Sequence, residues 1–147
     1  MIEYINLAEE ELTKGRYVPI TGAFAVIKVG HKFLLGYNRY RKQWEFPAGH
    51  IEDKETPRET ARRELYEETH QEIQQLEFRG LCKIYDARRD AVRYQAVYFG
   101  KLRGLKEFKA TPKDEMEELI LWDFKEDIGE IDIVDCEIVR RSCREYL

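Results

Sequence analysis

The sequence has few of the residues that build disulfide frameworks and zinc sites. Its cysteines are Cys82, Cys136 and Cys143, and its histidines are His31, His50 and His70. An odd number of scattered cysteines predicts reduced thiols in a cytoplasmic protein, not a disulfide framework. The histidines show no metal-ligand spacing, so we do not expect a zinc site.

The chain also lacks a long apolar run and an excess of positive charge. No stretch reaches transmembrane length and the N-terminal residues show no signal-peptide pattern, so we expect no membrane partner. The formal net charge of −4 argues against nonspecific binding of nucleic acid. An acidic protein that binds polyphosphates must therefore use metal ions or a local basic patch. With 43% hydrophobic and 37% charged residues and no repeat or linker, residues 1–147 are expected to form one domain.

Hydrophobic patterning predicts strands before and after a central helix, and a second helix at the end. The predicted strands cover residues 18–29, 32–36, 73–85, 92–102 and 118–124, and the closing helix covers residues 133–146. Residues 1–15 fit either a short strand or a helical turn. In the first long strand, Ala23 and Ala25 alternate with Phe24 and Val26, which predicts burial on both faces. This order favours a mixed sheet between helices.

The central helix has clear start signals. Thr56 is a typical N-cap, Pro57 fits the first helical position, and Glu59 completes a capping box. We expect the helix to run to about residue 69. Ala61 and Leu65, four residues apart, are its predicted buried stripe.

The end of this helix carries an unfavourable set of charges. Glu64, Glu67 and Glu68 share one face, where like charges cost roughly 0.2–0.5 kcal/mol per pair and oppose the helix dipole. Residues that break the local rules of helix stability without an evident local gain tend to mark functional sites. Clustered carboxylates are ligands that suit Mg²⁺. The alternative is a solvated ladder in which Glu59, Arg63 and Glu67 pair along the surface.

The residues around this helix match a known motif. The pattern G-x5-E-x7-R-E-U-x-E-E-x-G-U, with U aliphatic, is satisfied by Gly49, Glu55, Arg63, Glu64, Leu65, Glu67 and Glu68. With the preceding run W-E-F-P-A-G, the sequence resembles the Nudix hydrolase family. Two positions depart from the motif, because His70 replaces its glycine and Gln71 its last aliphatic residue. Histidine tolerates the left-handed C-cap conformation, and Ile73 is expected to replace the packing of the missing aliphatic side chain.

The resemblance implies an α/β (α+β) fold of the Nudix type, an α/β/α sandwich with a mixed sheet. It also implies a cofactor, Mg²⁺ or Mn²⁺, and hydrolysis of the pyrophosphate bond in a small-molecule nucleotide. The size of the chain favours a nucleoside triphosphate pyrophosphatase of the MutT type. Hydrolysis of ADP-ribose, a nucleotide sugar or a dinucleoside polyphosphate stays an alternative, as does a non-catalytic nucleotide-sensing module. Many relatives are dimers, which leaves a homodimer open.

The resemblance also assigns roles to residues of the motif. Glu64, Glu67 and Glu68 would be metal ligands and catalytic groups, together with the backbone carbonyl of Ala48 as a further ligand. Arg63 would orient these carboxylates. The absence of a side chain at Gly49 would let the loop approach the metal and substrate.

Other candidates lie outside the motif. Glu115, in the acidic run at residues 114–118, is the candidate general base, although Glu64 is an alternative and a solvated charge run is another interpretation. Arg39 and Arg41 are candidate ligands of the substrate phosphates or simply part of a basic surface loop. Trp44 and Phe46 are predicted core anchors. For Tyr85 and Tyr94 the alternatives are a nucleobase pocket and ordinary strand packing.

Overall fold

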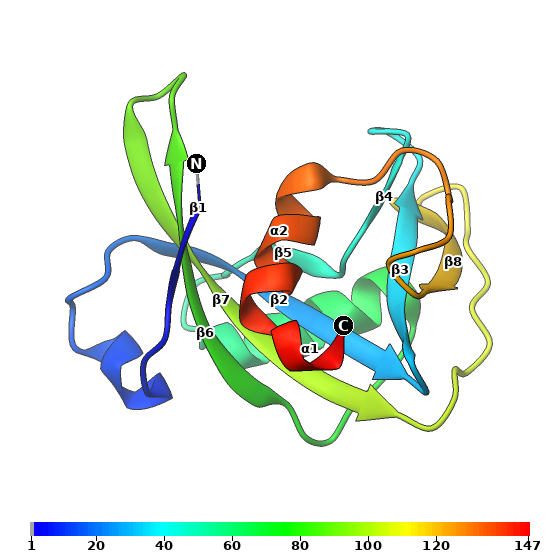
Figure 1. The fold of residues 1–147 in the computed structure, drawn as a ribbon, viewed down its shortest axis with the longest axis horizontal. Helices are drawn as coiled ribbons and strands as arrows, with labels where there is room; N and C mark the ends of the chain where they lie inside the picture. Colours follow the sequence, from blue (N-terminus) through cyan, green and yellow to red (C-terminus); the bar gives the residue numbers. More distant parts are fainter. Residues whose placement is uncertain (1) are drawn as a thin grey trace.

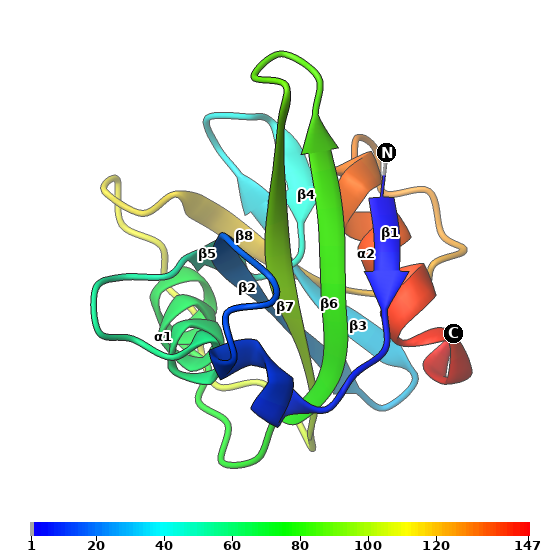
Figure 2. The same ribbon diagram turned by 90° about the vertical axis from the view of Figure 1, so that its left-hand side faces the viewer.

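The computed structural model describes residues 2–147, which form an eight-stranded mixed sheet between two α-helices (Figure 1). The strands are β1 (Ile2–Ile5), β2 (Ile20–Val29), β3 (Lys32–Asn38), β4 (Gln43–Glu45), β5 (Ala48–His50), β6 (Glu77–Asp86), β7 (Ala91–Leu102) and β8 (Met116–Trp122). The helices are α1 (Pro57–Thr69) and α2 (Ile133–Ser142), with short 3-10 helices η1 (Glu9–Thr13) and η2 (Arg144–Tyr146). Seen from two directions, α1 and α2 lie on opposite faces of the sheet (Figure 2), which confirms the predicted sandwich.

The connectivity of the sheet gives β2 different neighbours along its length. The strand order is β1-β6-β7-β2-β3-β4, with β5 paired to β2 and β8 paired to β3. Strand β2 runs parallel to β7, but it is antiparallel to β5 at its beginning and to β3 only at its last two residues. Strand β3 and its partners β4 and β8 therefore diverge from β2 beyond the hairpin, and β5 pairs with β2 at the other end, over Gly22 to Phe24.

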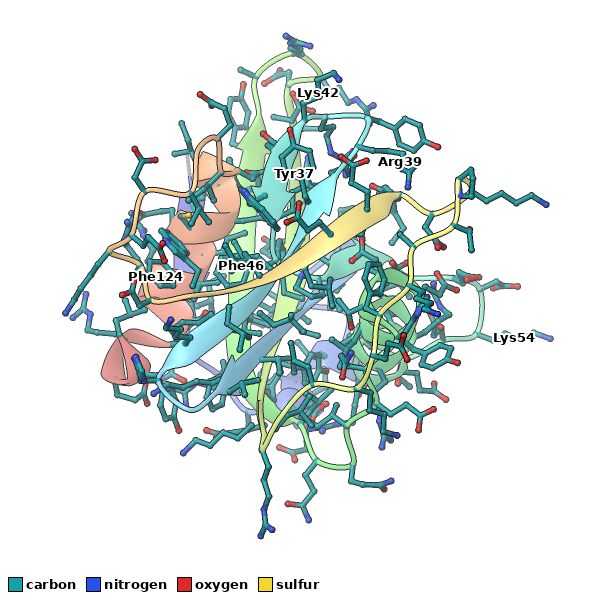
Figure 3. The ribbon with its side chains drawn as sticks, turned by 90° about the vertical axis from the view of Figure 1, so that its right-hand side faces the viewer. Tyr37, Arg39, Lys42, Phe46, Lys54 and Phe124 are labelled. Atoms are coloured by element: carbon teal, nitrogen blue, oxygen red, sulfur yellow. The ribbon has the colours of Figure 1, made fainter. Side chains whose placement is uncertain are left out.

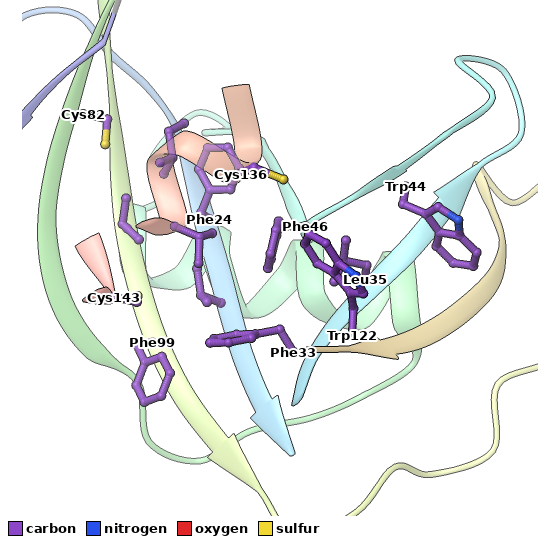
Figure 4. Packing of buried hydrophobic residues seen from close by; sticks show 14 of the residues in the cluster. Phe24, Phe33, Leu35, Trp44, Phe46, Cys82, Phe99, Trp122, Cys136 and Cys143 are labelled. Carbon is purple, nitrogen blue, oxygen red and sulfur yellow. The ribbon is translucent and has the colours of Figure 1, made fainter. Parts of the chain in front are cut away.

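The core occupies both faces of β2. Ala23 and Ala25 pack with Leu65 on the side of α1, whereas Phe24 and Val26 pack on the side of α2. Figure 4 shows the second cluster, in which Phe24, Phe33 and Phe46 lie close together under α2. The predicted two-sided burial of β2 is confirmed.

Helix α1 begins and ends as its sequence predicts. The N–H of Glu59 donates to Thr56 Oγ1 at 3.1 Å, and the N–H of Thr56 donates to Glu59 Oε1 at 2.9 Å, which forms the capping box. The helix ends at His70, whose φ of 61° and ψ of 16° are left-handed. Ala61 and Leu65 are both buried, as expected.

Several boundaries differ from the prediction. The W-E-F-P-A-G run, which lies outside the predicted strands, overlaps β4 and β5, because it pairs with β3 and β2. Residues 73–76 precede β6 and turn Ile73 and Leu76 into the core. Residues 1–15, left undecided above, contain both a strand and a 3-10 helix, and α2 ends at Ser142, earlier than predicted. No helix within residues 2–147 has the length and apolar character needed to cross a bilayer.

Candidate functional site

The candidate site lies where the last turns of α1 face β5. Glu68 is buried, and its Oε1 accepts the N–H of Ala48 at 3.0 Å. Glu64 approaches Gly49 so closely that a Cβ on the glycine would lie 2.1 Å from the Glu64 carboxyl carbon. The missing side chain at Gly49 therefore allows α1 to place two carboxylates against the loop that leads out of β4.

Burial and neighbouring like charges both act on the carboxylates in this position. Burial raises the pKa of Glu68 well above its usual range, and repulsion from Glu64, Glu115 and Glu45 raises it further. Burial also raises the pKa of Glu64, against the opposing effect of Arg63. A buried carboxylate with like charges nearby favours binding either a proton or a cation.

Arg63 connects the loop before α1 to the acidic residues. Its Nε donates to Glu55 Oε2 at 2.7 Å and its Nη2 donates to the carbonyl of His50 at 2.9 Å. Its Nη1 donates to Glu64 Oε1 at 2.8 Å and to Glu67 Oε2 at 3.2 Å. The bond from Arg63 lowers the pKa of Glu55 to about 2. Arg63 thus contacts protein groups on every side and occupies the position expected of an orienting residue.

Glu67 lies apart from the other two glutamates. Its side chain is 55% exposed and its contact is the ion pair with Arg63. Within residues 2–147, no three His, Cys, Asp or Glu side chains converge closely enough to hold one ion. The shared face predicted from the sequence therefore has two members turned towards β5 and one turned towards solvent. The alternative ladder forms in part, since Arg63 and Glu67 pair, whereas Glu59 is used in the capping box.

Glu115 reaches the same site from the segment before β8. Its Oε1 accepts from Asn38 Nδ2 at 2.6 Å and from Arg41 Nη2 at 3.0 Å. The same two residues hold Glu45, since Arg41 Nε donates to Glu45 Oε2 at 2.7 Å. Sequence reasoning missed Asn38 and Glu45. The one available signal for Glu45 was its position inside the W-E-F-P-A-G run. The sequence does not show which side chains surround this glutamate.

The two candidate arginines are in different situations. The guanidinium of Arg41 is already bound by Glu45 and Glu115. Arg39 lies beside the start of β8 (Figure 3), and its Nη2 donates to the carbonyl of Thr111 at 3.1 Å. Its Nε is buried and has no hydrogen-bond partner within the described residues. Arg39 therefore has one buried donor without a partner among the described residues, whereas Arg41 binds Glu115.

A pocket of about 160 Å³ adjoins β5 on the side of α2. Its lining comprises Phe24, Glu45, Phe46, Ala48, Gly49, His50, Gln95, Asp132 and Asp135. Asp135 accepts the N–H of Phe46 at 2.9 Å, and burial raises the pKa of this carboxyl well above its usual range. No signal in the sequence pointed to Asp132 and Asp135, because acidic residues at the start of a helix ordinarily serve as caps. The predicted anchor Phe46 is buried, as is Trp44 outside the pocket.

The residues of the site fit a hard divalent cation. The donors are carboxylate oxygens, which Mg²⁺ prefers. Burial, with a further contribution from neighbouring carboxylates, raises the pKa of Glu64 and of Glu68, and a bound cation would offset both effects. Gly49 provides close backbone approach beside them.

Comparison with known proteins agrees with this geometry. The model of the NUDIX domain matches residues 17–133. The pyrophosphohydrolase BsRppH of Bacillus subtilis superposes with a TM-score of 0.73 at 19% identity, covering 98% of this chain and 90% of that chain. The MutT Nudix hydrolase of Burkholderia pseudomallei gives 0.68 at 18% identity, with coverages of 82% and 95%. The Nudix domain of Shewanella oneidensis NrtR, solved with ADP ribose, gives 0.68 at 18% identity, with coverages of 95% and 98%. No curated protein matches the sequence.

Proposed function

This chain belongs to the Nudix family of hydrolases, enzymes that cleave a pyrophosphate bond in nucleotide derivatives, and we propose that its substrate is a nucleoside triphosphate. The pocket beside Gly49 supports this choice. Phe24 and Phe46 contribute apolar atoms to its lining, and Asp132 and Asp135 contribute polar groups that could meet a base. A small pocket of this kind next to the acidic site suits one nucleobase attached to a phosphate chain.

The acidic residues would hold the divalent ion. In this proposal Glu64, Glu67 and Glu68 and the carbonyl of Ala48 bind Mg²⁺ or Mn²⁺. When bound, such an ion neutralises phosphate charge and makes water a better nucleophile. Arg63 keeps the carboxylates in position through its contacts with the loop before α1.

The remaining residues would move the proton and orient the phosphates. Glu115 is the proposed general base, because its side chain is 43% exposed and therefore reachable by water, while Asn38 and Arg41 fix its position. Glu64 is the alternative base. Arg39 would bind a phosphate oxygen through its guanidinium group.

The observation that carries the proposal is the pair of carboxylates, Glu64 and Glu68, held against β5 with raised pKa values. We expect Glu68→Gln and Glu67→Gln each to lower kcat by about 100-fold or more, because metal stabilisation is worth several kcal/mol. The control is Glu59→Gln on the same helix. Steady-state hydrolysis with Mg²⁺, and its loss in EDTA, measures the effect. Near-wild-type turnover in both variants, or persistent activity in chelator, contradicts the proposal.

A nucleotide-sensing module is the second candidate. It is favoured by the exposure of Glu67 and by the absence, within residues 2–147, of three acidic side chains that converge on one ion. A phosphate-release screen over triphosphates, sugar nucleotides and dinucleoside polyphosphates separates the two functions. Thermal stabilisation by a nucleotide without turnover of any of them identifies the module.

A further inference from the structure

A second hollow, of about 460 Å³, continues from the pocket beside β5. Its walls come from the residues before and at the start of β2, from the end of β5 and from the projecting β6–β7 hairpin (Figure 2). His50 and Gln95 line both cavities. A ligand in the smaller pocket could therefore extend into this hollow without leaving the protein surface.

The hollow has the opposite charge to the acidic site. Its charged lining residues are Arg89, Arg93 and Asp86. The Asp86 carboxylate accepts the N–H of Arg88 at 3.0 Å and lies 3.8 Å from Arg89. No ion pair within residues 2–147 includes the half-buried Arg93. This surplus of positive charge occurs in a protein whose net charge is −4.

An unpartnered polar atom also lies at the hollow. The hydroxyl oxygen of Thr21 is buried and has no hydrogen-bond partner among the described residues. A buried hydroxyl without a partner is unfavourable, so a polar ligand that displaced the atoms covering it would gain a hydrogen bond. Thr21 lies beside Gly22, which pairs with Gln95 of β7.

We propose that this hollow binds a second phosphate group of the substrate, separate from the pyrophosphate that is cleaved. Arginine forks match the geometry of phosphate oxygens, and Arg93 is the arginine whose charge no carboxylate balances. The inference rests on the proposed function for the position of the nucleotide, whose base would occupy the pocket beside Gly49. The substrate class becomes a nucleotide whose sugar carries a further phosphate, either as a free monoester or as a diester to another nucleotide.

Binding of reaction-product analogues tests this without turnover. Isothermal titration calorimetry of the full chain, with no metal added, compares adenosine 5′-monophosphate with the 3′,5′- and 2′,5′-bisphosphates. We expect one bisphosphate to bind at least about tenfold more tightly than the monophosphate, equivalent to about 1.4 kcal/mol. Arg93→Gln should remove this preference, and the matched variant Arg88→Gln, outside the hollow, should keep it. Equal affinities in the wild type, or an unchanged preference in Arg93→Gln, overturn the inference.

Two further measurements keep the test decisive. Arg93→Lys retains the charge, so its preference should lie between those of wild type and Arg93→Gln even if the glutamine variant folds poorly. A 5′-phosphorylated dinucleotide shows whether the second phosphate is a monoester or a diester. If it binds as tightly as the bisphosphate does, the hollow accepts a diester; if it binds more weakly, the hollow requires a monoester. If the protein hydrolyses no nucleotide but still binds the bisphosphate more tightly, only the proposed function is contradicted. Hydrolysis without that preference contradicts only the hollow's assignment.

Discussion

At the scale of single residues, Gly49 decides how closely α1 approaches β5. A methyl group there would overlap Glu64, at 2.1 Å from its carboxyl carbon and 2.2 Å from its Oε1. We therefore expect Gly49→Ala to displace the Glu64 carboxylate and lower kcat by about 100-fold, as misplacement by about 1 Å can do. Gly104→Ala is the control, since its Cβ would meet nothing within 4 Å. Turnover in Gly49→Ala similar to that of the control would refute this reading of the glycine.

Asp135 gives a prediction about stability and pH. Burial raises the pKa of its carboxyl well above the unfolded value of about 3.9. The folded state therefore binds this proton more tightly, and the associated stability is present below about pH 4 and is lost as pH rises through the folded pKa. Asp135→Asn keeps an oxygen to accept the N–H of Phe46 and removes the titration.

We expect Asp135→Asn to gain stability over wild type as pH rises from about 4 to 8, by about 1.4 kcal/mol for each unit by which the pKa is raised. Urea unfolding at several pH values measures the difference in free energy of unfolding. A difference that does not change with pH would show that Asp135 titrates normally.

At the scale of elements, Gln71 joins the end of α1 to the segment before β8. Its side chain is buried; its Nε2 donates to the carbonyl of Lys106 and its Oε1 accepts the N–H of Lys106, both at 2.8 Å. Gln71→Leu should cost about 1–3 kcal/mol, because it removes two hydrogen bonds that contribute about 0.5–1.5 kcal/mol each. It should also speed amide exchange at Lys106. Gln74→Leu, at an exposed position, is the matched control. Equal destabilisation by the two variants would contradict this role of the Gln71 hydrogen bonds.

The parts of the fold that were predictable depend on local signals. The capping box joins Thr56 and Glu59 within one turn, and the alternation along β2 records burial on both faces, so each could be read from a few neighbouring residues. Strands β4 and β5 were missed because they are three residues long and are defined by pairing with β3 and β2. Such pairing leaves no periodic pattern in so short a segment.

The same distinction applies to the site. The glutamates of α1 were found because a motif fixes their spacing. The motif departure at Gln71 was expected only to shift packing to Ile73, which is indeed buried, but its own amide has a partner 35 residues away. Likewise Asn38 contacts Glu115 across 77 residues. Contacts of this kind are set by the sheet topology and by no property of the separate segments.

At the scale of the whole molecule, the fold separates charge along one surface. Strand β5 lies between the acidic end of α1 and the arginine-lined hollow, since Ala48 contacts Glu68 while His50 lines the hollow. The sheet brings these two regions together because β5 and β7 both pair with β2. A phosphate-bearing ligand would thus meet two regions side by side, one that binds phosphate through a divalent cation and one that binds phosphate through arginine.

The acidic side of this arrangement predicts how unfolding of the whole chain responds to metal. Burial and mutual repulsion make Glu64 and Glu68 unfavourable in the folded state, so a bound ion should stabilise it. At 100 times its dissociation constant, Mg²⁺ would add about 2.7 kcal/mol, or about 5–10 °C in Tm for a chain of this size. Without metal, Glu68→Gln should instead raise Tm, because it removes the buried charge. Calorimetric scans in MgCl₂, and in KCl of equal ionic strength, measure both effects. An equal Tm increase in KCl, or an undiminished Mg²⁺ response in Glu64→Gln/Glu68→Gln, would show that the carboxylates do not bind the ion.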